Sequence, residues 1–219
     1  IARRHISSIN PHCRVTAIQG SLPQQEVLDA VAAADIALGC TDQHYARVAL
    51  SDLACRYCVP VIDCGVSLEG KDGAITGQVI ELTRMFPADP CVYCRRRVDS
   101  RRVQQELMSP TEREQRMAAA EKAAEQGLGG DPYWKNVPQM NTVGYLTTAV
   151  GAMAAGYAIG YITDRFRIPF GRLQLDLCAP LFAPVDQPCN PRPDCSCRRA
   201  RGLADQGMAE ALITTPAHW

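Results

Sequence analysis

The sequence lacks the features that mark several large classes of protein. Its 219 residues include 23 basic and 23 acidic side chains, so the formal net charge is zero and no attraction to nucleic acid is expected. The first residues, Ile1-Ala-Arg-Arg-His5, contain no apolar core of a secretory signal, so we expect a cytoplasmic protein. Eleven cysteines, about 5% of the chain, are too few for a disulfide scaffold. In a cytoplasmic chain such cysteines more often bind metal.

Long hydrophobic runs are also scarce. The uncharged run that approaches the length of a membrane span is Val143–Ile162. It is rich in alanine, glycine and threonine rather than leucine and isoleucine, and no basic clusters flank it. Its pattern Gly156-x-x-x-Gly160 is one that occurs at helix contacts in membranes. A buried helix is the simpler interpretation, and we expect no contact with a membrane.

What the sequence does contain is an alternation of short apolar runs and helical periodicities. Strands are predicted at 14–18, at 36–38 and from residue 61, and helices over 24–33 and 43–57 separate them. A first helix over 1–9 is closed by Asn10-Pro11. This alternation with short connections is typical of a parallel sheet in an α/β fold.

The second half of the chain departs from that pattern. Two strand-like runs, Val61–Leu68 and Ile75–Thr83, flank a turn at 69–73 with two glycines, which predicts an antiparallel hairpin. A polar crossover segment is predicted over 95–139, and it contains a helix that begins at the capping box Ser109-Pro-Thr-Glu112 and ends near Gln126. A loop at 129–132, a helix over 142–164 and a half-exposed strand over 172–177 are predicted next. The tail over 179–219 is rich in proline, cysteine and arginine.

The strongest chemical signal is the spacing of four cysteines. Cys91-Val-Tyr-Cys94 is one pair and Cys195-Ser-Cys197 is another. Each pair can give two thiolates to one tetrahedral zinc ion, because two cysteines in a tight turn point both sulfurs inward. Such an ion would tie the tail back to the sheet. Cys189 is a reserve ligand, and the alternative is a set of reduced thiols without metal.

A third pair, Cys55-x-x-Cys58, has the same spacing in a different setting. It lies at the end of a predicted helix, just before Val59-Pro60, so both thiols fall on one buried face. Buried cysteine behaves as a small hydrophobe. We therefore predict core packing for this pair rather than metal binding or redox chemistry.

A candidate ligand site follows the strand at 36–38. The strand ends at Gly39, and Cys40, Thr41 and Asp42 come next, before a helix that carries Arg47. Ligands of open α/β sheets bind outside the carboxyl ends of the strands. Asp42 is therefore placed to meet a nucleotide or a metal ion, although an aspartate here also caps helices. Arg47 would contact phosphate or pair with a carboxylate at the sheet edge.

The Cys-Thr-Asp segment, with its arginine five residues after the aspartate, resembles that of the MoeB, ThiF and HesA family of ubiquitin-activating-like enzymes. The resemblance covers nearly the whole chain. It is carried also by Ile9-Asn-Pro11, Pro60-Val-Ile-Asp-Cys-Gly65, both cysteine pairs, Met108-Ser-Pro-Thr-Glu-Arg113 and the helix after Asn141. It implies a Rossmann-like mixed sheet with an antiparallel extension and a zinc-stapled C-terminal tail, although Cys195-x-Cys197 departs from the Cys-x-x-Cys of the family.

The same resemblance implies a function. Family members use ATP and Mg²⁺ to adenylate the C-terminal glycine of a ubiquitin-like or sulfur-carrier protein, and a homodimer is expected. By resemblance, Asp42 holds the magnesium ion and Arg47 assists at the site. The residues expected near the nucleotide are Ser21, Leu22, Cys40 and Thr41, and those expected to bind Zn²⁺ are Cys91, Cys94, Cys195 and Cys197.

Two family features are missing from these residues. The Gly-x-Gly-x-x-Gly turn that cradles ATP phosphates at a helix N-terminus does not occur. We therefore expect residues 1–219 to be one ThiF-like domain, the C-terminal two-thirds of a longer chain, and inactive alone. No cysteine lies between Cys94 and Cys178, which excludes a thioester on the crossover segment and leaves Cys64, Cys178 and Cys189 as weak candidates. The alternative function is a non-catalytic zinc-stapled module that binds a protein or dimerises through the helix over 142–164.

Overall fold

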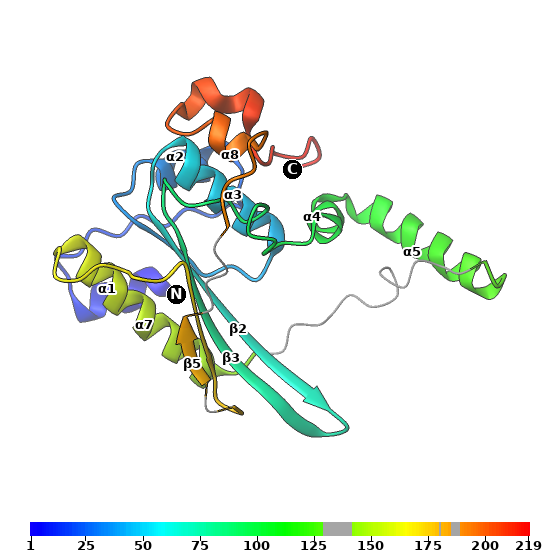
Figure 1. Ribbon diagram of the computed structural model, residues 1–219, viewed down its shortest axis with the longest axis horizontal. Helices are drawn as coiled ribbons and strands as arrows, with labels where there is room; N and C mark the ends of the chain where they lie inside the picture. The colour runs from blue at the N-terminus through cyan, green and yellow to red at the C-terminus, as the bar shows by residue number, and fades with distance from the viewer. Residues whose placement is uncertain (129–141, 180, 185–188) are drawn as a thin grey trace.

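A five-stranded mixed sheet lies at the centre of the fold (Figure 1). The computed structural model describes residues 1–128, 142–179, 181–184 and 189–219. The strands follow in the order β1-β2-β3-β4-β5, and β1 pairs parallel to β2 whereas the other pairs are antiparallel. Their bounds are Ala37–Gly39, Val61–Lys71, Ala74–Met85, Arg172–Asp176 and Leu181–Pro184. The predicted α/β fold with an antiparallel extension is confirmed.

The β2–β3 hairpin forms where the glycine pattern predicted it. Its two-residue connection is Asp72-Gly73, and both residues have positive φ angles, of 52° and 80°. Such a turn matches the right-handed twist of the strands, and glycine adopts this backbone conformation without steric cost. The strands run further than expected on both sides of the turn, so the hairpin extends beyond the packed core (Figure 1).

Helix α3 (His44–Arg56) packs on one face of the sheet, with Val48 and Leu53 fully buried. Helix α7 (Gly144–Ile162) packs on β2 and β3, where it joins a second core cluster around Ile62, Ile80 and Leu82. Its buried side chains recur every four residues, as expected for one helical face. They are Leu146, Val150, Ala154 and Ala158.

The prediction that the uncharged helix over 142–164 would be buried is only partly right. The outward face of α7 is exposed, and Ile159 and Ile162 retain 62% and 63% of their accessible surface. The helix covers the sheet with one side only, so its other side faces outward. The composition of the segment is apolar on both sides and did not reveal this difference. Among the described residues, none of the helices has the length and apolar character needed to cross a bilayer.

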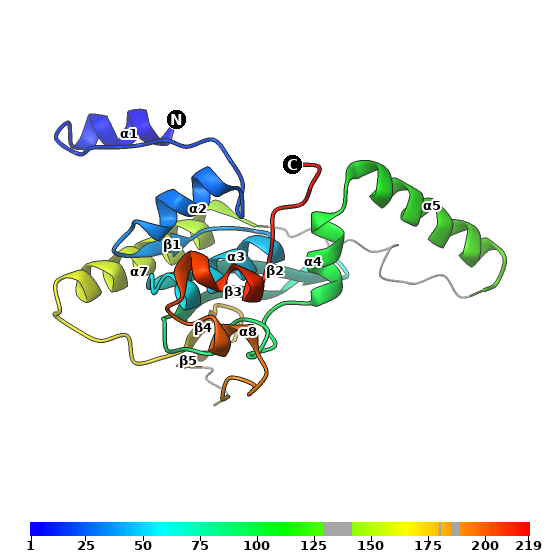
Figure 2. The ribbon, with the colours of Figure 1, turned by 90° about the horizontal axis from the view of Figure 1, so that it is seen from above.

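The crossover segment contains one predicted helix and one that was missed. Helix α5 (Pro110–Glu125) begins with the predicted capping box between Ser109 and Glu112. Helix α4 (Ser100–Leu107), capped by Asp99, was not predicted because its sequence is strongly polar, yet it buries Val103 and Gln105 near α3. Helix α5 projects away from the body in both views (Figures 1 and 2). The predicted loop at 129–132 lies outside the described residues.

The predicted strand at 14–18 does not form. These residues lie between α1 (Ala2–Ile9) and α2 (Gln25–Ala32) and pair with no strand. A strand needs a neighbour to satisfy its backbone groups. Within the described part of the chain, β1 is an edge strand that pairs only with β2. Helix α1 forms as expected but buries none of its residues and stands off from the sheet in Figure 2.

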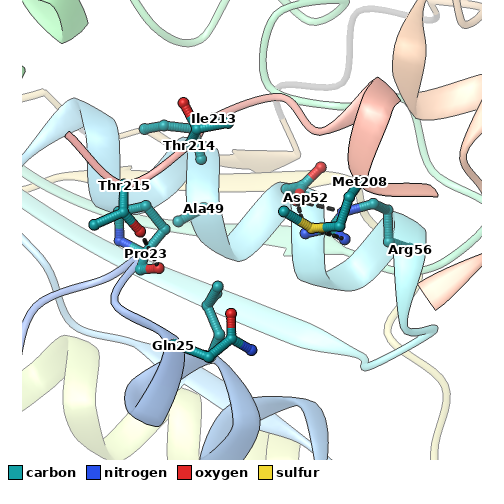
Figure 3. A pocket seen from close by; sticks show the side chains of 10 residues that line it. Pro23, Gln25, Ala49, Asp52, Arg56, Met208, Ile213, Thr214 and Thr215 are labelled. Carbon is teal, nitrogen blue, oxygen red and sulfur yellow. Dashed lines mark hydrogen bonds and ion pairs between the residues drawn. The ribbon is translucent and has the colours of Figure 1, made fainter. Parts of the chain in front are cut away.

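The C-terminal tail packs against a buried ion pair within α3 (Figure 3). Arg56 Nη2 lies 2.6 Å from Asp52 Oδ2, and these side chains are 1% and 4% exposed. Arg56 also donates to the carbonyl of Ala204, and Asp52 Oδ1 accepts from the backbone N–H of Leu212. The tail contributes α8 (Ser196–Arg199) and the 3₁₀ helix η1 (Ala204–Glu210), neither of which was predicted.

Candidate functional site

A cavity of about 340 Å³ opens at the carboxyl end of β1, beside the middle of β2. This volume falls in the range of small-molecule sites. The segment after β1, the middle of β2, and helices α3 and α7 all contribute to its wall. The lining residues are Cys40, Thr41, Asp42, Arg47, Cys64, Gly65, Val66, Thr142, Thr147, Val150 and Gly151. Four of the predicted site residues, at 40, 41, 42 and 47, therefore meet around one cavity.

Asp42 does not serve as the helix cap that was the alternative interpretation. The N-cap of α3 is Gln43, and no side chain makes a capping hydrogen bond there. The Asp42 side chain is exposed at the cavity. Beside it, Thr41 Oγ1 is buried and has no hydrogen-bond partner among the residues that the structure describes. A buried hydroxyl without a partner costs free energy unless a ligand or water binds it.

Arg47 pairs with a carboxylate that sequence reasoning did not single out. Its Nε lies 3.2 Å from Asp63 Oδ2, and its Nη2 donates to the carbonyl of Thr41 at 3.3 Å. Asp63 is in β2 and only 5% exposed. Burial raises the pKa of Asp63 to about 7, although the positive charge of Arg47 opposes this shift. The pair fixes the loop after β1 to the second strand.

Gly39 allows β1 to approach this ion pair. A Cβ atom at position 39 would lie 2.7 Å from Asp63 Oδ1 and 2.7 Å from Leu50 Cδ1. Any side chain there would push β1 away from β2 or from α3. The glycine that ends the strand is therefore needed for close packing at the cavity, and not only for the turn.

A second, partly buried carboxylate lies on the next strand. Glu81 of β3 accepts from Arg97 at 2.6 Å and also from Arg172. Burial acts to raise the pKa of Glu81, but the hydrogen bonds and charges of the two arginines outweigh it and lower that pKa. Glu81 therefore stays ionised, which orders the crossover segment after Cys94 against the sheet.

Ser21 and Leu22 are not among the residues that line the cavity. Leu22 packs against the core cluster on the α3 side of the sheet. Ser21 hydrogen-bonds to the hydroxyl of Tyr45, which acts to lower the pKa of that phenol against the larger effect of burial. Both residues therefore support the start of α2 and α3 in this structure.

Two of the cavity residues are cysteines in contact. A hydrogen bond with Cys64 lowers the pKa of Cys40 to about 6, and burial opposes this shift. The pKa of Cys64 is raised, first by its hydrogen bond with Cys40 and then by burial. Cys40 is exposed whereas Cys64 is 6% exposed. The cavity therefore contains an accessible thiol backed by a buried one.

The second candidate site is a cluster of four thiols. The sulfurs of Cys91, Cys94, Cys195 and Cys197 all lie within 4.8 Å of one another. Cys91 Sγ is 3.7 Å from Cys195 Sγ, and Cys94 Sγ is 4.0 Å from Cys197 Sγ. Zinc–sulfur bonds of about 2.3 Å place the sulfurs of a tetrahedral site about 3.8 Å apart. The donor set fits a Zn²⁺ ion, and it is the set that the sequence predicted.

The surroundings of the cluster also suit bound metal. The backbone N–H of Arg192 donates to Cys94 Sγ at 3.4 Å. Hydrogen bonds of this kind to ligand atoms are typical of the outer shell of metal sites. Cys55 packs beside Cys91, Cys195 and Cys197 in one buried group, as predicted for a core cysteine. Cys58, expected to be buried with it, is instead exposed and has a positive φ of 59°.

Comparison with known proteins decides the family. A model of the ThiF family matches residues 1–197. The chain belongs to the ThiF family. This family comprises ubiquitin-activating and adenylyltransferase-like proteins, which typically bind ATP and act on ubiquitin-like or sulfur-carrier proteins. No curated protein matches the sequence.

Two groups at the cavity could bind a ligand. The Thr41 hydroxyl has no partner among the described residues, and the Asp42 carboxylate is exposed. Carboxylate oxygens are ligands that suit a hard cation such as Mg²⁺. Asp63 was the main residue missed. The signal that could have revealed it is a charged residue inside the apolar run Val61–Cys64, because a buried charge needs a partner.

Proposed function

We propose that this ThiF-family protein adenylates the C-terminal glycine of a ubiquitin-like or sulfur-carrier protein with ATP. The observation that carries the proposal is the position of Asp42. Its carboxylate lies at the cavity beside the Thr41 hydroxyl, which has no partner in the described part of the chain, and it is not used to cap α3. Both groups are therefore available to a ligand at the sheet end where α/β proteins bind nucleotides.

In the proposed reaction, a carboxylate oxygen of the carrier protein attacks the α-phosphorus of ATP, and pyrophosphate leaves. Asp42 would hold a Mg²⁺ ion, which neutralises phosphate charge when bound. Thr41 would donate a hydrogen bond from its hydroxyl to an oxygen of the bound nucleotide. Arg47 is held by Asp63 and by the Thr41 carbonyl, so it fixes the loop that carries both residues. The enzyme contributes mainly positioning and charge stabilisation.

The four-cysteine cluster has a structural role in this proposal. A Zn²⁺ ion held by Cys91, Cys94, Cys195 and Cys197 would join the segment after β3 to the tail. That segment leads directly into Arg97, whose side chain holds Glu81. A closed set of four thiolates leaves no open position for a substrate. The ion would therefore support the fold around the cavity rather than take part in adenylation.

The test is carrier-dependent exchange between labelled pyrophosphate and ATP, measured on the protein as the cell makes it. Asp42→Ala should lower the exchange rate by at least about 100-fold, as expected when one positioned electrostatic group is removed. Asp35→Ala is the matched control, since Asp35 is also exposed but lies before β1, at the opposite end of that strand.

Two results would contradict the proposal. The first is exchange in Asp42→Ala within a few-fold of the wild type. The second is an equal loss in Asp35→Ala, which would show that the effect is not local to the cavity. A lower melting temperature in Asp42→Ala with normal exchange per folded molecule would assign the residue to the fold.

The alternative is a non-catalytic module that dimerises through α7. It is favoured by the exposed apolar face of that helix, where Ile159 and Ile162 are each more than half exposed. A chain that shows no exchange with any carrier protein but sediments as a dimer would support this function. Ile159→Lys should then give a monomer, whereas a dimer unchanged by that substitution would exclude α7 as the contact.

A further inference from the structure

The two cavity cysteines occupy neighbouring positions, Cys40 directly after β1 and Cys64 within β2. β1 and β2 are parallel, and their register pairs Gly39 with Asp63, so Cys40 and Cys64 follow that pair side by side. Neighbouring strands lie about 4.8 Å apart, which is within the Cα separation that a disulfide spans. The spacing of the two strands therefore suits a disulfide between these positions.

The side chains also share one face of the sheet. A Cβ atom at Gly39 would touch the Asp63 carboxylate, so positions 39 and 63 face the α3 side. Successive residues of a strand point to opposite faces. Cys40 and Cys64 accordingly face the α7 side, where Cys64 packs in the core cluster that contains Val150. Cys40 lines the same cavity as Cys64, together with Val150 and Gly151 of α7.

The pair combines one accessible and one protected sulfur. Cys40 is exposed at the cavity, whereas Cys64 is 6% exposed. An oxidant that enters the cavity can reach the first sulfur, and the second is held against it. Exposed thiols placed beside a second, resolving thiol are typical of oxidation-sensitive sites. The four-thiol cluster differs, because its sulfurs are arranged as metal ligands.

We propose that Cys40 and Cys64 form a reversible disulfide when the protein meets hydrogen peroxide. The Cys40 sulfur attacks the peroxide O–O bond, forming a sulfenic acid and releasing water. The Cys64 sulfur then attacks the Cys40 sulfur, forming the S–S bond and releasing a second water. In total, two thiols lose two hydrogen atoms and one hydrogen peroxide is reduced to two waters. A dithiol reductant reverses the reaction by thiol–disulfide exchange.

The proposal concerns thiol chemistry alone and does not depend on adenylation. The test treats the zinc-loaded chain with hydrogen peroxide, alkylates the remaining thiols, and maps non-reduced tryptic peptides by mass spectrometry. Cys40 falls in the peptide Val15–Arg47 and Cys64 in the peptide Tyr57–Lys71. We expect these two peptides to be linked, to have lost two hydrogen atoms together, and to separate on reduction with dithiothreitol.

A matched control is built into the second peptide, which also contains Cys58. Cys58 is exposed, like Cys40, but it precedes β2 and is not among the residues that line the cavity. Cys58→Ala should keep the link. Cys64→Ala should lose it and leave Cys40 as a sulfenic acid that dimedone traps. Should Cys64→Ala fail to fold, fragmentation of the wild-type linked peptides identifies whether residue 58 or 64 carries the bond.

Three results would overturn the proposal. One is a link that persists in Cys64→Ala. Another is a link that fragmentation places at Cys58. The third is wild-type protein in which peroxide leaves the two peptides unlinked while it oxidises the exposed Cys13, because the oxidant would then have acted without closing the pair.

Discussion

Replacing Asp52 by alanine should remove much of the stability of the C-terminal tail. Asp52 is the counter-ion of Arg56, and both side chains are almost fully buried. Its second oxygen accepts the backbone N–H of Leu212. Asp52→Ala would leave a buried guanidinium without its anion and a partly buried N–H without its acceptor. Figure 3 shows how closely α3 and Met208 of η1 surround this pair.

The magnitude follows from burial. Removing one partner of a buried ion pair costs about 3–5 kcal/mol, because the remaining charge stays away from water. A domain of this kind is stable by roughly 5–15 kcal/mol in total. We therefore expect Asp52→Ala to lower the free energy of unfolding by about 4 kcal/mol. Asp52→Asn should cost less, because the amide oxygen can still accept the Leu212 N–H.

The assay is urea unfolding followed by circular dichroism, with zinc content measured for each variant. Glu210→Gln is the matched control, because it breaks the Arg199–Glu210 pair of the same tail, which is at the surface. That control should leave the unfolding midpoint unchanged within error, since exposed pairs contribute little. Equal midpoints for Asp52→Ala and Glu210→Gln would refute the reasoning. Faster amide exchange over 204–213 in Asp52→Ala would confirm where the loss occurs.

Two further predictions follow from the buried thiols and carboxylates. Cys94→Ser should abolish binding of one zinc per chain, measured by metal analysis, whereas Cys189→Ser should retain it; unchanged zinc in Cys94→Ser would exclude the assigned ligands. Burial raises the folded-state pKa of Asp63 to about 7, above the ordinary aspartate value of 3.8, so its favourable contribution to stability is complete below about pH 4 and is lost as the pH rises through 7. Urea unfolding from pH 4 to 8 should therefore show that the stability of Asp63→Asn increases relative to the wild type as the pH rises. A stability difference that stays constant with pH would contradict the raised pKa.

The parts of the fold that the sequence predicted well are those with a local physical cause. Asp72-Gly73 specifies a tight turn through positive φ angles, and Ser109 with Glu112 satisfies the first N–H groups of α5. The spacing within each cysteine pair belongs to the same category, because a metal site constrains ligand type and separation. Each of these signals acts within a few residues of the chain, so it survives without knowledge of the neighbours.

The parts that were missed or wrong depend on neighbours distant in the sequence. The run at 14–18 alternates like a strand but pairs with nothing among the described residues, so its backbone has no ladder. Helix α4 was missed because its polar sequence gains stability from contact with α3, and the exposure of α7 was missed because only one of its faces meets a sheet. Periodicity reports what a segment can bury, and tertiary structure decides what it does bury.

The cavity shows the same division within a few residues. Cys40, Thr41 and Asp42 could be placed from the end of β1, because the carboxyl end of a strand is where a ligand binds. Asp63 could not, since β2 is buried on both faces and its residues 61–64 show no alternation. The side of the sheet that Asp63 faces is determined by its register with Gly39, whose missing side chain makes room for the carboxylate. The same register brings Cys40 beside Cys64. The pairing of β1 with β2 therefore positions both the Arg47–Asp63 ion pair on one face of the sheet and the two thiols on the other.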